Sequence, residues 1–531
     1  MRQWLAGTPT FLRASVRDNR VVLAVWAAIG VLLSVSAVKS FDLVFTDPAD
    51  TASMQAVLAT NPAIGLILGP VGDLSTADGF SAWRNVALGG LLVGIGMALL
   101  VTKTSRGQED SGEAELFASG VMGRGTRLAT SCALGFIGSL AVGVATGVSG
   151  AASGGSWGTQ LLIGATFTVT GWMATGLAAV AAQLGSDRRT ASTLAVATLA
   201  VLYGLRGFCH SLDAPEWTIW ANPLGWMTEV NAGTGSDERW WPLLLGVALA
   251  ALLFIEAFLL QSRRDFGVGA LTPRPGRDRG RLRSVWGLAL RLNRGSLAAW
   301  LAAFCVLGTV FGYFVTSIQD SLADNPMVQQ VMASGGTSQA DLAGGLVTMV
   351  LTMIGIVSTI VGVQVFLGMR AEELDHRIDP VLGAAVSRTR LMGASVVPAL
   401  AAPAVGLLLA AGVMGAFVHG ADLGLSAIDV LAQAAATVPA AWVVVALAAA
   451  LVGAVPRATP AIWVAIVGSL LLTLLGPLLD LPDRVLAVNP FHHVPSVFAA
   501  ESSWTGAIGL AGVAVALAAA GFLGFRRRDM A

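Results

Sequence analysis

The chain has 531 residues, of which 55% are hydrophobic and only 12% are charged, and its formal net charge is zero. Soluble proteins carry roughly 25% charged residues, so this composition excludes an ordinary soluble domain and is typical of a polytopic membrane protein. The neutral balance gives no sign of a nucleic-acid partner. The cysteines Cys132, Cys209 and Cys305 are scattered and show neither a metal-binding nor a disulfide pattern.

Apolar segments recur along the whole chain, and a helix needs about 20 such residues to cross a bilayer core of about 30 Å. The predicted spans are residues 21–38, 86–101, 128–148, 161–184, 191–205, 243–260, 297–315, 346–367, 394–418, 430–452, 461–479 and 507–525. The fifth is the shortest. We therefore predict an all-α polytopic membrane protein with about twelve transmembrane helices.

The basic residues set the predicted orientation, because cytoplasmic loops are enriched in Lys and Arg. With the N-terminus inside, all but five of the 32 basic residues fall in cytoplasmic segments. The five predicted to lie outside are Lys39, Arg84, Arg206, Arg239 and Arg484. One missed or additional helix would invert every later loop and destroy this asymmetry. Both termini are therefore predicted to be cytoplasmic.

The sequence also contains an internal repeat. Residues 17–20 (RDNR) correspond to 291–294 (RLNR), 222–223 (NP) to 489–490 (NP), and 263–265 (RRD) to 527–529 (RRD). These landmarks occur in the same order, which predicts two parallel six-helix halves, residues 1–265 and 284–531, joined by a cytoplasmic linker at 266–283. The first apolar run has a counterpart deep in the chain, which argues against a cleaved signal peptide.

Two predicted cytoplasmic loops share a pattern that is acidic at the start, apolar in the middle and basic at the end. The acidic and basic residues singled out are Glu109, Glu113, Glu115 and Arg124 in the first loop, and Glu373, Asp379 and Arg388 in the second. Apolar residues recur at helical spacing at 116, 117 and 121 and at 381, 382 and 386. Asp379 suits a helix N-cap and Pro380 suits the first turn. Each loop is thus predicted to form a short amphipathic helix under the membrane.

These loop helices could contact either another protein or the lipid surface. Their many acidic residues do not suit an anionic leaflet, which favours a protein partner. Segments 4–16 and 282–292 mix Arg with apolar residues and are predicted to be interfacial helices. Outside, loops 206–240 and 480–504 are rich in aromatic residues, as expected at a membrane boundary, where short helices would dip into the outer leaflet.

Few polar groups lie within the predicted spans. Hydroxyl and thioether side chains that suit an adaptable substrate cavity are Tyr203 in the fifth span and Thr348, Met349, Thr352 and Met353 in the eighth. Ordinary helix packing through Thr is an equal alternative. Glu256 is the one acid clearly inside a span, and it is a candidate functional residue or a partner of nearby basic residues. The pair His492-His493 has no third ligand at useful spacing, so no metal site is predicted.

Nucleotide hydrolysis by this chain is not expected, because a phosphate-binding P-loop needs a Gly-rich turn and a Lys before Ser or Thr. The chain has lysine only at Lys39 and Lys103, and neither follows a glycine. If ATP drives this protein, another chain hydrolyses it.

These landmarks resemble a fused permease of an ABC-2 type ATP-binding cassette exporter, in the branch called exporters of polyketide antibiotics, which includes the tetronasin-type permeases. The resemblance rests on the loops after Arg106 and Arg370, the segments 222–226 (NPLGW), 239–242 (RWWP) and 489–495 (NPFHHVP), and the RRD closures. It spans nearly the whole chain. Loop one departs from loop two in lacking the Asp-Pro start.

The resemblance implies that segments 109–122 and 373–386 are coupling helices, each seated on one of two copies of a nucleotide-binding subunit that carries ATP and Mg. It also implies a cavity lined by the second, fifth, eighth and eleventh spans. Amphiphilic drugs or polyketide-like natural products would leave a bacterium through its cytoplasmic membrane by this route. A proton-coupled twelve-helix facilitator is the main alternative, although intramembrane acids are scarce and its Gly-Asp-Arg loop is absent. A lipid-modifying enzyme would need a polar catalytic cluster, and none is evident.

Overall fold

The computed structural model describes residues 4–44, 55, 62–112, 122–211, 214–264, 269–270, 284–323, 339–384, 386–421, 424–476, 481–499 and 503–528. Every regular element in these ranges is a helix, and 11 of the helices are long and apolar enough to cross a membrane. The predicted all-α polytopic class is therefore confirmed. Contacts divide the chain into Met1–Gly276 and Arg277–Ala531, and each half is described by itself.

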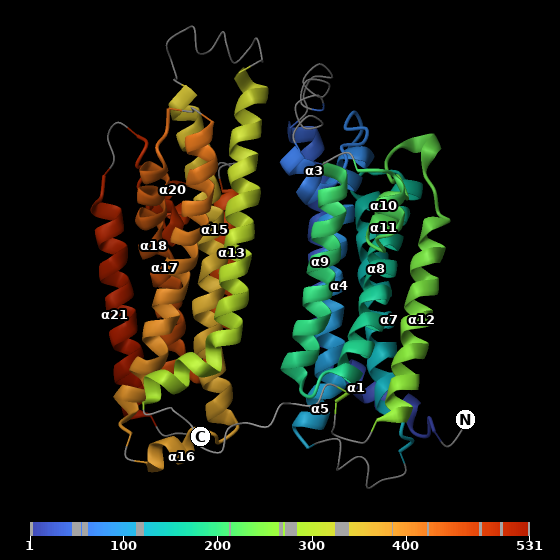
Figure 1. The fold of residues 1–531 in the computed structure, drawn as a ribbon, viewed down its shortest axis with the longest axis horizontal. Coiled ribbons are helices and arrows are strands. Elements are labelled where there is room, and N and C mark those ends of the chain that lie inside the picture. Colours follow the sequence, from blue (N-terminus) through green and yellow to red (C-terminus); the bar gives the residue numbers. More distant parts are fainter. Residues whose placement is uncertain are drawn as a thin grey trace. The chain divides into compact units, whose positions relative to one another are not determined.

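The first half is a bundle of six long helices around α8 (Figure 1). These helices are α1 (Thr8–Val44), α4 (Ala77–Thr104), α7 (Thr126–Ala152), α8 (Trp157–Leu184), α9 (Arg188–Ser211) and α12 (Pro242–Arg263). Helix α8 packs against α4, α7, α9 and α12. The short helix α3 (Pro62–Leu68) packs against α9, and α5 (Arg106–Asp110) extends α4.

The second half repeats the helix order of the first. Its long helices are α13 (Val285–Ala323), α15 (Gln339–Leu374), α17 (Arg388–Gly420), α18 (Ala427–Ala454), α19 (Ala461–Leu475) and α21 (Thr505–Arg527). The neighbours also repeat: α18 packs against α15, α17 and α21 as α8 packs against α4, α7 and α12. One interhelical hydrogen bond recurs, because Trp172 Nε1 donates to the Phe136 carbonyl (3.1 Å) and Trp442 Nε1 to the Leu400 carbonyl (2.9 Å).

Four predicted segments differ from the structure in length or extent. The predicted fifth span, 191–205, is part of the 24-residue helix α9, whereas the predicted eleventh, 461–479, is the 15-residue helix α19. Of the predicted interfacial helices, 4–16 and 282–292, residues 8–16 and 285–292 are not separate elements but the first turns of α1 and α13, which have 37 and 39 residues. At 1.5 Å per residue these helices exceed the bilayer core. Figure 1 shows the start of α13 lying across the lower end of its half before the helix turns upward.

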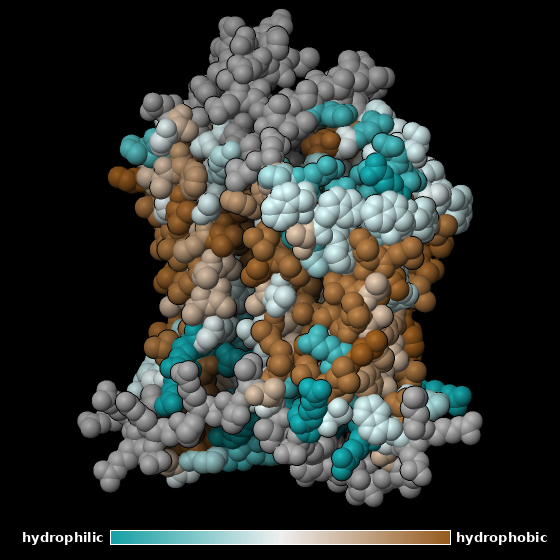
Figure 2. Space-filling model, turned by 45° about the vertical axis from the view of Figure 1, so that its right-hand side comes forward, coloured by the Kyte–Doolittle hydropathy of each residue, from teal (hydrophilic) through white to brown (hydrophobic). Residues whose placement is uncertain are grey.

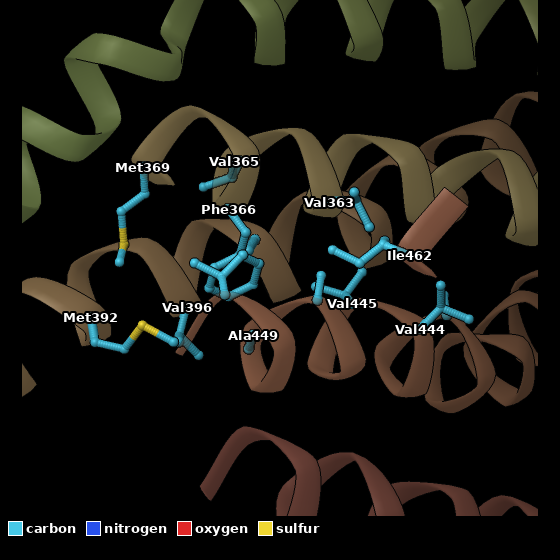
Figure 3. Packing of buried hydrophobic residues seen from close by; sticks show 14 of the residues in the cluster. Val363, Val365, Phe366, Met369, Met392, Val396, Val444, Val445, Ala449 and Ile462 are labelled. Carbon is cyan, nitrogen blue, oxygen red and sulfur yellow. The ribbon is translucent and has the colours of Figure 1, made fainter. Parts of the chain in front are cut away.

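Apolar packing holds the helices of each half together. In the second half, Phe366 and Met369 of α15 point toward α17 and α18, where Met392, Val396 and Ala449 lie (Figure 3). Phe366 is fully buried. Fully burying one such side chain contributes about 1.5–3 kcal/mol.

Polar and aromatic groups collect at the ends of the helices, and apolar side chains cover their middle (Figure 2). Short helices stand in the predicted aromatic outer loops, as expected: α10 (Trp217–Trp220), α11 (Gly225–Thr228), α20 (Asp483–Leu486) and the 3-10 helix η3 (Pro490–His493). The rings of Trp220 and Trp241 stack with centroids 5.1 Å apart. Of the predicted linker 266–283, only residues 269–270 lie within the described ranges.

Candidate functional site

A buried carboxylate joins three elements at the end of the first half where α5 lies. Glu109 in α5 accepts hydrogen bonds from Arg106 of the same helix, Arg127 of α7 (2.5 Å) and Arg264, which directly follows α12 (2.7 Å). Only 4% of the Glu109 side chain is exposed. We call these four residues the first-half cluster.

The second half holds the equivalent arrangement. Glu373, near the end of α15, pairs with Arg370 of the same helix (2.9 Å) and with Arg528, which directly follows α21 (2.6 Å). Its side chain is 2% exposed. In both halves the terminal arginine lies 155 residues after the glutamate. We call Glu373, Arg370 and Arg528 the second-half cluster.

Each cluster ties the last long helix of its half to the predicted coupling loop. Arginine–carboxylate pairs are directional, and a buried pair resists separation because breaking it leaves an uncompensated charge. The ion pairs of Glu109 and Glu373 therefore hold each loop to the residue that directly follows α12 or α21. The clusters differ in charge, since one carboxylate faces three arginines in the first half and two in the second.

The rest of the second coupling loop lies at the surface. Helix α16 (Asp379–Gly383) begins at Asp379, and Ile378 is its N-cap, so the predicted N-cap role of Asp379 is wrong by one residue. Pro380 does stand in the first turn, as predicted. The exposed carboxylate of Asp379 instead lies 3.3 Å from the His376 ring. This shift leaves the Asp379 carboxylate outward, where another protein can reach it.

The apolar face of α16 and the basic end of its loop point back to the bundle. Val381, Leu382 and Val386 pack against the second-half core, as the helical spacing predicts. Arg388, another predicted coupling residue, donates from Nη1 to the Arg528 carbonyl (2.7 Å). The loop is therefore held both by packing and by the end of α21.

In the first loop, Glu113 and Glu115, together with the predicted apolar face at 116, 117 and 121, lie outside the described residues. Arg124 is exposed, and its carbonyl accepts a hydrogen bond from Gln261 of α12 (3.0 Å). The loop end is thus fastened to α12, as Arg388 is fastened to the end of α21.

The predicted cavity residues have different surroundings. Tyr203 of α9 donates to the Ile67 carbonyl and lines a small cavity. The hydroxyls of Thr348 and Thr352 donate within α15, to the carbonyls of Gly344 and Thr348 (2.8 Å each). Of the two methionines, Met349 is exposed and Met353 is half-buried. In the second half, the hydroxyls of Thr348 and Thr352 therefore bond within their own helix, and Met349 is the most exposed of the four residues.

A sequence model of the family described as "Multidrug efflux system permease Rv1217c, C-terminal domain" matches residues 15–260 and 282–526. These two segments coincide with the two bundles. The chain is also 34% identical over 532 residues to the multidrug efflux system permease protein Rv1217c of Mycobacterium tuberculosis (strain ATCC 25618 / H37Rv), which covers 99% of this chain and 95% of that protein. The chain belongs to this family of multidrug efflux permeases. With 11 apolar helices in the described part of the chain, the permease is a multi-pass protein of a bacterial membrane.

Several polar residues of the permease have positions that the sequence did not predict. Arg206 was expected to start an outer loop, but α9 continues to Ser211 and Arg206 is 1% exposed. Arg127 and Arg264 join the first-half cluster without having been predicted as site residues. The repeated RRD closure at 263–265 was the signal that could have found Arg264. Glu256, the intramembrane candidate, is exposed on α12.

Proposed function

We propose that this permease is the membrane-spanning part of an ABC-2 type exporter that moves amphiphilic drugs or polyketide-like natural products out of the cell. Two copies of a separate nucleotide-binding subunit supply the energy, with ATP and Mg bound on those chains. The observation that carries the proposal is the match of nearly the full chain to a protein named a multidrug efflux system permease. The absence of a P-loop from the sequence agrees with an external motor.

In this proposal, the buried and the exposed residues of the two cytoplasmic loops have different roles. The buried positions of Glu109 and Glu373 suit positioning residues, which hold each loop against the last helix of its half. The exposed Asp379 and Arg124 suit direct contact with the motor, and Glu113 and Glu115 stay proposed contact residues on sequence grounds. Closure of the ATPase dimer would displace both coupling loops, and the two clusters would transmit this displacement to α12 and α21.

Purification of the tagged permease from its native membranes in mild detergent, with mass spectrometry of the bound proteins, tests the proposal. We expect a P-loop ATPase at about two copies per permease. Recovery of the permease alone, also after crosslinking, would contradict it. That result would favour the proton-coupled alternative and make Glu256 the first residue to replace.

Charge reversal at the exposed α16 tests the contact surface. We expect Asp379→Lys to lower recovery of the ATPase about tenfold, which corresponds to about 1.4 kcal/mol, while the permease still inserts and folds. Asp483→Lys is the matched control, because Asp483 is also exposed but lies in α20, in the predicted outer loop. Equal recovery with both variants would remove Asp379 from the interface.

A further inference from the structure

Exposed basic side chains gather near the start of α1, the first helix of the first half. Arg13, Arg17 and Arg20 are exposed, whereas Asn19, just before the last of them, is buried. The three arginines have no ion-pair partner in the described part of the chain. They differ in this from the arginines of the first-half cluster, which share one buried carboxylate. Their charges are therefore available to a ligand.

The three arginines share one face of the helix. At 3.6 residues per turn, positions 13, 17 and 20 lie within an arc of about 60°, and the exposed Asp18 is about 100° or more from each of them. Like charges three and four residues apart repel one another and destabilise a helix. An anion that contacts two or three of these guanidinium groups at once would relieve that repulsion.

A fourth cation comes from the neighbouring helix α4. Lys103, in the last turn of α4, is exposed, and its Nζ donates to Oδ1 of Asn19 (3.2 Å). The Nδ2 of Asn19 in turn donates to the Ser15 carbonyl (2.9 Å), so Asn19 is a positioning residue that holds the ammonium group beside α1. An ammonium group has three donors, and Asn19 is the only acceptor for Lys103 among the described residues, so further donors remain for a ligand. We call Arg13, Arg17, Arg20 and Lys103 the basic patch.

The basic patch lies where the exposed apolar surface of the two helices ends. Val21 directly follows Arg20 and is 67% exposed, and Val25 is also exposed one turn later. On α4, the exposed Leu99 lies one turn before Lys103. Such side chains face the hydrocarbon of a bilayer, which puts the patch at the depth of the lipid headgroups. The N-terminus and α5 lie at this end of the first half (Figure 1), the end that is predicted to be cytoplasmic.

The second half repeats part of this arrangement. Arg291 and Arg294 of α13 are exposed and have no ion-pair partner among the described residues. Asn293 again donates from Nδ2 to the carbonyl four residues earlier (2.9 Å). The lysine is not repeated: with the glutamates of the two clusters aligned, Leu367 stands where the first half has Lys103. The arginine pair is thus common to both halves, and the complete basic patch belongs to the first.

We infer that the basic patch is a binding site for the headgroup of an anionic phospholipid in the cytoplasmic leaflet. Arginine donates to phosphate oxygens through two parallel N–H groups, and an ammonium group binds phosphate as a point charge. A zwitterionic headgroup fits less well, because it would bring its own ammonium group among four cations. A lipid is favoured over a soluble anion, because the exposed Val21 and Val25 beside the patch give its acyl chains an apolar surface.

The strength of the site follows from the number of cations. Each basic residue close to an anionic membrane surface favours association by about fivefold. The patch has four such residues, whereas Arg291 and Arg294 give the second half two, so the second half holds a weaker site of the same kind. The inference goes beyond the proposed export function, and lipid binding to the permease does not depend on the ATPase.

Titration of the purified full-length permease with dioctanoyl phosphatidylglycerol tests the site, in a neutral maltoside detergent and with microscale thermophoresis as the readout. We expect this lipid to bind at least tenfold more tightly than dioctanoyl phosphatidylcholine. The pair Arg17→Gln and Arg20→Gln is expected to weaken binding of phosphatidylglycerol at least tenfold, and Lys103→Gln about fivefold. The pair Arg291→Gln and Arg294→Gln should change the affinity of the stronger site less than about twofold, because that site lies in the first half.

The matched control is the pair Arg263→Gln and Arg457→Gln, which removes two exposed positive charges from predicted cytoplasmic segments outside α1, α4 and α13. An equal loss of affinity in this control, or equal binding of the two lipids to the unmodified permease, would overturn the inference. Displacement of phosphatidylglycerol by an equal concentration of inorganic phosphate would also overturn it, because a soluble anion would then occupy the patch. Melting temperatures show whether each variant is folded, and Lys103→Gln carries the test if the arginine variant is not. Failure here would leave the ATPase purification result unaffected.

Discussion

Replacement of Glu109 by glutamine is expected to destabilise the first half of the permease by about 3–5 kcal/mol, the cost typical of removing one partner from a buried ion pair. The neutral amide would leave Arg106, Arg127 and Arg264 close together without their shared counter-charge. The end of α12 would then separate from α5 and α7. The yield of monodisperse protein in detergent and its melting temperature measure this effect.

The second half provides a substitution with a smaller expected loss of stability, and also a control. Glu373→Gln removes the counter-charge of two arginines rather than three, so we expect a smaller loss of stability than for Glu109→Gln. Glu372→Gln is the matched control, because the Glu372 side chain is 32% exposed and pairs with the exposed Arg377, and surface pairs contribute about 0–1 kcal/mol. Equal melting temperatures for Glu372→Gln and Glu373→Gln would show that the second-half cluster does not hold the helix end.

A double-mutant cycle separates the ion pair from the general effect of substitution. Arg528→Gln combined with Glu373→Gln should cost less than the sum of the two single changes, because the second change removes a charge that the first left uncompensated. Additive losses would mean that each residue acts through its own packing, such as the contact of Arg528 with the Phe525 ring. The cycle thus tests the link between the coupling loop and α21 directly.

The helix content and the internal repeat could be predicted because both depend on patterns that one sequence displays. Long apolar runs locate membrane helices, and the placement of arginines orders them. The ends of the helices were less predictable. Helix α9 continues through Arg206 to Ser211, and the buried guanidinium donates a hydrogen bond to the Ile67 carbonyl. Hydropathy counts that residue as polar wherever its side chain points.

The roles within the coupling loops could be predicted only in part. The sequence pattern does not distinguish Glu109, Glu373 and Asp379, because each is an acidic residue that precedes a basic one. In the structure the two glutamates face inward to arginines up to 155 residues away, whereas Asp379 faces outward. Such pairing depends on which helices meet at the end of a bundle, and no local pattern contains that information. The RRD repeat was the one sequence feature that pointed to it.

Close backbone contact between α7 and α8 depends on two glycines. A Cβ at Gly164 would lie 2.3 Å from the Gly143 carbonyl oxygen, and a Cβ at Gly143 would lie 2.3 Å from the Gly164 carbonyl oxygen. Small residues let membrane helices approach in this way, and the resulting contacts drive their association. In the second half, α18 and α21 approach closely in a similar way, because a Cβ at Gly453 would lie 2.2 Å from the Gly521 carbonyl oxygen.

Gly164→Ala is therefore expected to destabilise the first half by about 1–3 kcal/mol, the usual cost of overpacking, because a backbone oxygen cannot rotate away as a side chain can. Gly158→Ala in the same helix should have the opposite sign. Nothing lies within 4 Å of a Cβ at that position, and alanine is favoured over glycine in a helix by up to about 1 kcal/mol. The melting temperatures of the two variants measure the contrast. If both substitutions raised the melting temperature, α7 and α8 would have room to separate, and the contact at Gly143 and Gly164 would not set their distance.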